Sequence, residues 1–130
     1  MSTRQEGNTV GVLTVDDQAV FRMAAVDVIA ATPGFEAVGE AASGEDALRL
    51  AETLRPDLVL IDVRMPGMDG IETSRRLTAQ QPAAVVVLIS LDAAFDFLPE
   101  ARSSGAATFV RKQDFCPTLL ARLWSLHRQR

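Results

Sequence analysis

The hydrophobic positions of this chain fall into short continuous runs, separated by longer segments in which apolar residues recur at helical spacing. The clearest run is Leu-Val-Leu-Ile at 58–61, which lies between Pro56 and a loop rich in proline and glycine. A short apolar run without alternation is typical of a strand that is buried on both faces, as in a parallel sheet. Runs at 10–15, 84–89 and 107–110 predict three more strands, and 35–41 suits an edge strand because Glu36 and Glu40 share one face.

Segments of helical spacing follow each of the five predicted strands. They predict helices at 18–32, from Ser43 to before Pro56, from Asp69 to about 81, at about 94–104 and at about 115–128. Ser43 and Asp69 are the expected N-caps, because each precedes an acidic residue three positions later. Pro99 is awkward inside the fourth helix, which either begins late with this proline in its first turn or is kinked.

Apolar residues mark an expected buried face on three of these helices. In the first helix the residues at helical spacing are Val20, Phe21, Ala24, Val28 and Ala31. In the second and the last they are Ala47, Leu50, Ala51, Leu54 and Leu119, Leu120, Leu123, Leu126. The only cysteine, Cys116, excludes an internal disulfide and is expected to be a small core residue.

Five strand–helix repeats predict an α/β fold, a parallel sheet covered by helices on both faces in a three-layer sandwich. A length of 130 residues fits one domain, which we expect at 10–130 after a flexible tail at 1–9. The formal net charge of −4 argues against nucleic-acid binding through a basic surface. The polar start and the lack of any apolar run of membrane length predict a cytoplasmic protein without membrane contact.

Polar residues follow four of the predicted strands near the point where each strand ends. Asp16 and Asp17 follow the first strand, Asp62 the third and Ser90 the fourth, and Lys112 comes shortly after the fifth. Right-handed crossovers bring the carboxyl ends of parallel strands to one edge of the sheet, where ligands bind in open α/β folds. We therefore expect these side chains to gather at that edge.

Three clustered carboxylates repel one another, by about 4 kcal/mol per pair at 4 Å and an effective dielectric of 20, so a cation must offset them. Oxygen ligands in a small, partly hydrated site suit Mg²⁺, which proteins hold with one or two carboxylates, waters and phosphate oxygens. Lys112 supplies a second positive charge that can hold a phosphate. Asp62 is central in this set and is the expected nucleophile, since a carboxylate can accept a phosphoryl group as an acyl phosphate.

This set of residues resembles the receiver domain of two-component response regulators. The runs VGEAASGEDAL and DVRMPGMDGIE are most similar to receivers of the subfamily that usually carries a C-terminal helix-turn-helix output domain. The resemblance implies the flavodoxin-like (βα)5 fold with strand order 2-1-3-4-5. It covers 10–128 and rests on Asp16, Asp17, Asp62 within DVRMPGMDG, Ser90, Phe109 and Lys112.

The resemblance also implies how the site works. Asp62 would accept a phosphoryl group from a histidine kinase or phosphotransfer protein, so the chain would be a signalling phosphoacceptor and not an enzyme. Asp17 and Asp62 would bind Mg²⁺ together with the backbone carbonyl of Arg64, and Asp16 would act mainly through water. Lys112 would hold the phosphate.

The same resemblance implies a switch next to this site. The Ser90 hydroxyl would swing toward the phosphate, and Phe109 occupies the position of a switching aromatic. Their motion would reshape the face formed by the fourth helix, the fifth strand and the fifth helix.

Some positions near the site depart from the usual receiver pattern, and others are ones that tune the phosphate lifetime in the family. Leu91 is bulkier than the Ala or Gly that is common after the serine, which predicts narrowed access and slow transfer and hydrolysis. Asp92 and Arg64 occupy positions that tune the phosphate lifetime in the family, in a direction that the sequence does not reveal. Pro99 should disturb the fourth helix, so docking or dimerisation there is expected to be atypical.

Two other functions stay open at this point. A haloacid-dehalogenase-like phosphatase also uses strand-end acids and Mg²⁺, but its acids stand as D-x-D, whereas Asp16 and Asp17 are adjacent. A pseudo-receiver would be an interaction module that never takes phosphate; Leu91 favours it slightly, and the complete acid, hydroxyl and lysine set argues against it. The downstream partner is open as well: the chain either acts alone through protein contacts, as a homodimer or in a phosphorelay, or is a receiver without its C-terminal DNA-binding domain.

Overall fold

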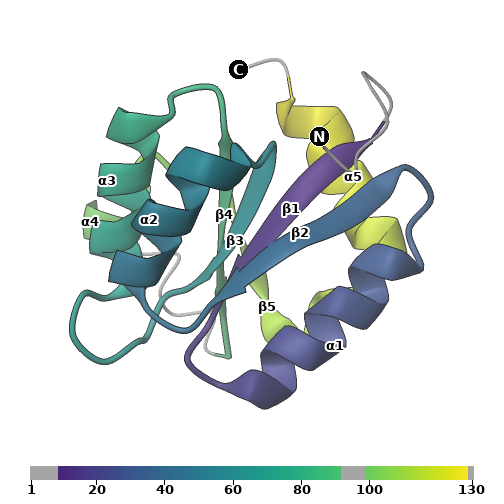
Figure 1. Ribbon diagram of the computed structural model, residues 1–130, viewed down its shortest axis with the longest axis horizontal. Coiled ribbons are helices and arrows are strands. Elements are labelled where there is room, and N and C mark those ends of the chain that lie inside the picture. Colours follow the sequence, from purple (N-terminus) through teal and green to yellow (C-terminus); the bar gives the residue numbers. More distant parts are fainter. Residues whose placement is uncertain (1–8, 92–98, 129–130) are drawn as a thin grey trace.

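The computed structural model describes residues 9–91 and 99–128 of the chain (Figure 1). The strands of its sheet are β1 (Val10–Val15), β2 (Phe35–Ala41), β3 (Leu58–Asp62), β4 (Val85–Ser90) and β5 (Thr108–Arg111). They pair in parallel in the order β2-β1-β3-β4-β5. The predicted α/β fold, its parallel sheet and its flavodoxin-like strand order are confirmed.

Helices cover both faces of this sheet. They are α1 (Ala19–Ala30), α2 (Gly44–Leu54), α3 (Gly70–Gln80), α4 (Pro99–Arg102) and α5 (Pro117–His127), and a 3-10 turn, η2 (Lys112–Asp114), leads into α5. The helices α1 and α5 lie on one face, and α2, α3 and α4 lie on the other (Figure 1). The result is the predicted three-layer sandwich.

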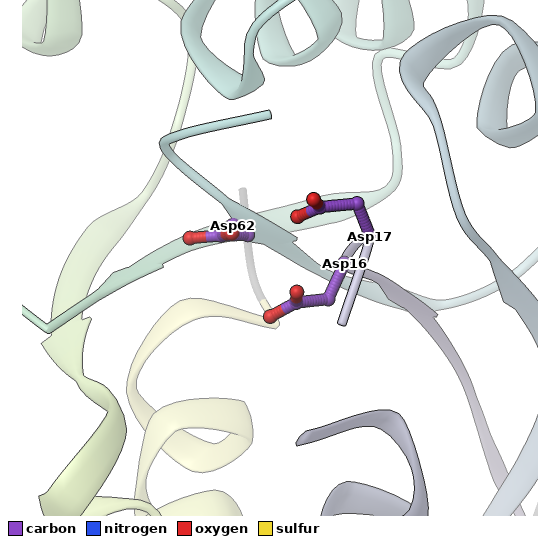
Figure 2. Close-up of side chains that lie close together, drawn as sticks. All are labelled: Asp16, Asp17 and Asp62. Atoms are coloured by element: carbon purple, nitrogen blue, oxygen red, sulfur yellow. The ribbon is translucent and has the colours of Figure 1, made fainter. Parts of the chain in front are cut away.

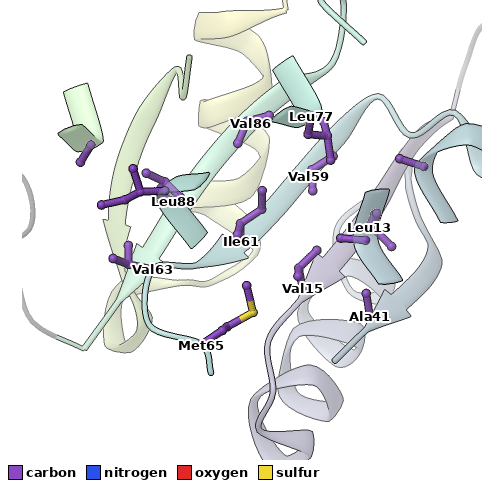
Figure 3. Packing of buried hydrophobic residues seen from close by; sticks show 14 residues of the cluster. Leu13, Val15, Ala41, Val59, Ile61, Val63, Met65, Leu77, Val86 and Leu88 are labelled. Atoms are coloured by element: carbon purple, nitrogen blue, oxygen red, sulfur yellow. The ribbon is translucent and has the colours of Figure 1, made fainter. Parts of the chain in front are cut away.

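The central strand β3 explains why the apolar run at 58–61 does not alternate. Val59 and Ile61 pack into the cluster on the α2–α3 side of the sheet (Figure 3), and Leu58 and Leu60 pack into the cluster on the α1–α5 side. Every residue of β3 is buried, including Asp62 at its end. Hydrophobic packing on both faces of the sheet therefore fixes β3, and with it the position of Asp62 at the sheet edge.

The predicted N-caps of α2 and α3 are confirmed. Ser43 Oγ accepts a hydrogen bond from the Asp46 N–H at 3.2 Å, and Asp69 Oδ1 accepts one from the Glu72 N–H at 2.9 Å. The N–H of Gly70, the first residue of α3, donates to the carbonyl of Val63 at 2.9 Å. The start of α3 is thereby tied to the end of β3.

Several residues that were expected in the core are exposed. In α1 the buried residues are Ala25 and Ile29, whereas Val20 is 81% exposed. In α5, Leu126 is 68% exposed. Both helices carry apolar residues on more than one side, so spacing alone does not select the buried face. Cys116 is exposed because it is the N-cap of α5 and not part of a packed face.

Element boundaries agree with the prediction to within a few residues. The strand β5 runs one residue later than expected, and α3 ends at Gln80. The described part of α4 begins at Pro99; positions 92–98 of the predicted fourth helix lie outside the described residues, as does 1–8 of the predicted tail. Within the described residues, no helix has the length and apolar character that crossing a membrane requires.

Candidate functional site

The carboxylates of Asp16, Asp17 and Asp62 gather at the carboxyl edge of the sheet (Figure 2). Asp62 ends β3, and Asp16 and Asp17 directly follow β1, the parallel neighbour of β3. One oxygen of each carboxylate lies within 4.8 Å of the other two. Asp16 and Asp62 are buried and Asp17 is exposed, so the cluster opens to solvent on the Asp17 side.

The ammonium of Lys112, the only lysine of the chain, lies against this cluster. Its Nζ is 2.6 Å from Asp16 Oδ2 and 3.7 Å from Asp62 Oδ2. The lysine side chain is only 8% exposed, so its charge is held inside the site. Three ionised carboxylates and one ammonium leave a formal charge of −2, which a divalent cation would balance.

Main-chain N–H groups contact the two buried carboxylates. The Gln18 N–H donates to Asp16 Oδ1 at 2.8 Å, while the Arg64 N–H is 3.4 Å from Asp62 Oδ1. Asp16 therefore has both oxygens in close contacts, one with Gln18 and one with Lys112. Asp62 makes longer contacts at both of its oxygens and is the buried carboxylate more readily available to a new partner.

The surroundings of Asp62 raise its pKa from 3.8 to about 6. Burial, which disfavours the charged form, is the largest cause, and the negative charge of Asp16 adds to it. The positive charge of Lys112 and the Arg64 N–H lower the pKa, but they do not outweigh these effects. A bound cation would favour the ionised form of Asp62 in the same way as Lys112 does.

Two of the three clustered carboxylates, Asp17 and Asp62, line an open pocket of about 370 Å³. Ser90, the last residue of β4, is buried, and Leu91 next to it is 71% exposed at the pocket rim. Phe109 is partly buried in β5 and packs against the core on the α2–α3 side of the sheet, away from the pocket lining. Asp92 lies outside the described residues. The pocket is lined by Asp17, Gln18, Asp62, Arg64, Ser90, Leu91 and Lys112.

The donor set of this site fits Mg²⁺. All three clustered side chains offer carboxylate oxygens, which are hard ligands, and the exposure of Asp17 leaves room for the waters that Mg²⁺ retains. A cation also needs an excess of negative charge that is partly shielded from water. The site has this excess, because three carboxylates face a single ammonium. The described residues thus support the magnesium prediction by their chemistry.

The sequence matches the response regulator receiver domain family over residues 12–123, which include the whole carboxylate cluster and Lys112. The chain belongs to this family. It is therefore a receiver domain of the response regulators of two-component systems, and the match favours this family over the phosphatase alternative.

Relatives agree with this assignment. The response regulator GacA of Pseudomonas aeruginosa is 40% identical over 101 residues, which are 78% of this chain and 47% of GacA. The signal receiver domain of the response regulator NarL from Mycobacterium tuberculosis has a TM-score of 0.81 and 32% identity, covering 95% of this chain and 99% of that one. CheY in the CheX–CheY–BeF3–Mg complex of Borrelia burgdorferi has a TM-score of 0.76 and 30% identity, covering 90% and 88%. This receiver domain thus spans about half the length of GacA.

Sequence reasoning missed Arg22, whose side chain contacts the backbone of Asp16 in the site of this receiver domain. Its Nη1 donates to the backbone carbonyl of Asp16 at 2.6 Å, and its Nε donates to Glu40 Oε1 at 3.1 Å. Arg22 thus links the acidic end of β1 to β2 through α1. The available signal was that Arg22 is the only charged residue in the otherwise apolar segment 19–26.

Replacing Arg22 with alanine is expected to lower the free energy of unfolding by about 2 kcal/mol, because a hydrogen bond from a charged donor to a partly buried carbonyl is lost. Urea unfolding measures the effect. The matched control is Arg49→Ala, which breaks an exposed ion pair with Asp46 and should change stability by less than about 1 kcal/mol. Equal losses in the two variants would contradict the structural role of Arg22.

Proposed function

We propose that this receiver domain is a phosphoacceptor switch and that Asp62 takes the phosphoryl group. The observation that carries the proposal is the environment of Asp62. This buried carboxylate has two neighbouring acids that can hold a divalent cation, and a lysine ammonium lies 3.7 Å away. A nucleophilic carboxylate, a cation site and an ammonium are the groups that phosphoryl transfer to an aspartate requires.

Asp17 and Asp62 would hold Mg²⁺ with the backbone carbonyl of Arg64. Asp16 would act through water, because both of its oxygens already have close contacts. The ion would neutralise charge on the carboxylates and on the phosphoryl oxygens. An oxygen of Asp62 attacks the phosphorus of a phosphohistidine; the phosphorus–nitrogen bond breaks, and its electron pair stays on the imidazole, which takes a proton from solvent. Lys112 binds the transferred phosphoryl oxygens.

Phosphorylation would then change the positions of Ser90 and Phe109. The new group adds about −1.5 to −2 charge, and the Ser90 hydroxyl at the pocket wall turns to donate to it. Phe109 packs on the α2–α3 side of the adjacent strand β5, so a shift of β4 at Ser90 reaches it through the sheet. The face formed by α4, β5 and α5 would change as a result and signal to an output domain or a separate protein.

The phosphoryl donor would be a histidine kinase or a phosphotransfer protein that docks on α1. Asp62 is reached from the open Asp17 side, which leads directly into the first turn of α1. Val20 and Met23 are large apolar residues three positions apart on this helix, and both are exposed. An exposed apolar pair beside the site suits contact with a helix of the donor.

Intact-mass spectrometry after incubation with acetyl phosphate and Mg²⁺ tests the proposal. We expect one added phosphoryl group that depends on the metal and is lost on treatment with hydroxylamine, which cleaves acyl phosphates. The variant Asp27→Asn, which changes an exposed acid on α1, should still take the group. An adduct that resists hydroxylamine, or one that forms equally well without metal, would contradict the assigned site.

Leu91 is expected to limit access to Asp62. Replacing this exposed rim residue with alanine should accelerate both phosphorylation by acetyl phosphate and loss of the group, each by about threefold to tenfold, and leave stability unchanged within about 0.5 kcal/mol. The matched control is Leu126→Ala, an equally exposed leucine on α5, which should change neither rate. If the wild-type chain takes no group and Leu91→Ala takes one, access was the limit; if neither does, the chain is a pseudo-receiver.

A further inference from the structure

The ammonium of Lys112 has an aromatic contact in addition to its two carboxylates. Its Nζ lies 4.8 Å from the centroid of the Phe21 ring, within the range in which a cation is attracted to a ring face. Phe21 comes from α1 and Lys112 from the turn η2 that follows β5, so the contact joins segments far apart in the chain. The ammonium therefore has carboxylates at the sheet edge and an aromatic ring from the α1 layer as neighbours.

A second phenylalanine connects this ring to the backbone of Lys112. The rings of Phe21 and Phe115 have centroids 6.3 Å apart at an interplanar angle of 46°, a tilted aromatic pair. The Phe115 N–H donates to the carbonyl of Lys112 at 3.2 Å, which closes the turn η2. Side chain and backbone of Lys112 are thus linked to the same pair of rings.

We propose that Phe21 is a positioning residue that holds the Lys112 ammonium at the phosphoryl site; this inference rests on the proposed function. A lysine side chain is long and flexible, and a contact in addition to the carboxylates makes it harder for the ammonium to leave the pocket for solvent. A carboxylate anchor would add negative charge to a site that already has three acids and must receive a phosphoryl dianion. An aromatic ring attracts the ammonium without adding net charge.

The position of Lys112 in the unphosphorylated chain explains what an aromatic contact contributes. Its Nζ is closer to Asp16 than to Asp62, at 2.6 and 3.7 Å, so it must shift toward the group that Asp62 receives. The ring face allows that shift, since attraction to a π-face is less directional than an ion pair. Phe21 thus keeps the ammonium near both carboxylates and lets it move between them.

Lysine-selective ¹³C labelling tests the contact independently of phosphorylation, because Lys112 is the only lysine and gives the only lysine signals. We expect the ε-methylene protons of Lys112 to show an upfield ring-current shift. The shift should disappear in Phe21→Leu and persist in Phe21→Tyr, which keeps the ring. A Lys112 signal at the ordinary lysine position in the wild type overturns the inference.

The rate of phosphorylation by acetyl phosphate tests the functional part. Phe21→Leu should reduce it by about threefold to tenfold, and Phe21→Tyr should restore it. Phe35→Leu is the matched control: it removes a partly buried ring from the same core cluster, and the rate should stay unchanged. In a Lys112→Met background, Phe21→Leu should have no further effect.

These results separate the two proposals. A similar loss from Phe21→Leu with and without Lys112 would assign Phe21 a purely structural role and overturn the inference. A wild-type chain with the ring-current shift but no phosphoryl adduct would overturn the proposed function and leave the aromatic anchor in place.

Discussion

Replacing Asp62 with asparagine is expected to abolish phosphorylation and, at the same time, to stabilise the folded chain at neutral pH without metal. The first effect follows because an amide cannot take the phosphoryl group as an acyl phosphate. The second follows because Asp62 is a buried carboxylate next to Asp16, and its folded-state pKa is raised to about 6. Loss of function combined with a gain in stability is typical of residues held in place for chemistry.

The sign of the stability change follows from proton binding. Between the ordinary pKa of 3.8 and the folded-state pKa of about 6, the folded state holds the Asp62 proton more tightly than the unfolded state does. The free energy of unfolding therefore falls as pH rises through this window, by up to about 3 kcal/mol in total. Asparagine removes this loss, and the attraction of Lys112 for the ionised carboxylate needs no separate correction because it is already included in the pKa of about 6. We expect a gain of about 2–3 kcal/mol at pH 7.5.

Urea unfolding of both forms at pH 7.5 and pH 5, without metal, measures this effect. The gain at pH 5 should be roughly half of that at pH 7.5, because Asp62 is then mostly protonated in the folded wild type. Adding Mg²⁺ should stabilise the wild type and have a much smaller effect on Asp62→Asn. Asp27→Asn serves as the exposed control and should change stability by less than about 0.5 kcal/mol at either pH. A pH-independent gain would show that the pKa of Asp62 is not its cause.

The parts of the structure that the sequence predicts well are those in which one physical requirement decides the residues. The strand β3 must be apolar on both faces, so its run of hydrophobic residues and the abrupt change at Asp62 are visible in the sequence. Parallel strands with right-handed crossovers share one carboxyl edge, which is enough to bring Asp16, Asp17 and Asp62 together. Caps such as Asp69 follow from local hydrogen bonding alone.

The predictions that failed concern which side of a helix faces the core. Leu126 and Val20 are as hydrophobic as the residues that are buried, and only the positions of neighbouring helices decide their exposure. The contacts of Arg22 and Phe21 were missed for a related reason, since their partners Asp16 and Lys112 come from other elements. Periodicity describes one element at a time, and these features depend on how α1 packs against the edge of the sheet.

Replacing Gly70 with alanine is expected to lower the free energy of unfolding by about 3 kcal/mol and the melting temperature by about 10 °C. A Cβ at this position would lie 2.0 Å from the carbonyl oxygen of Asp62 and 2.8 Å from the Cα of Val63. Both are backbone atoms, so a change of side-chain rotamer cannot relieve the clash. Relief requires that the start of α3 moves away from the end of β3, which also breaks the hydrogen bond from the Gly70 N–H to Val63.

Gly67 in the same loop provides the matched control. It has a φ of +74°, and a Cβ there would have no neighbouring atom within 4 Å, so alanine meets backbone strain of about 1 kcal/mol but no clash. Thermal unfolding and Mg²⁺ titration of both variants separate the two effects. Because the clash at Gly70 lies on the main chain of Asp62, Gly70→Ala should also weaken Mg²⁺ binding, whereas Gly67→Ala should preserve it. Equal stability losses with unchanged Mg²⁺ affinity would mean that the close approach of α3 does not hold Asp62 in place.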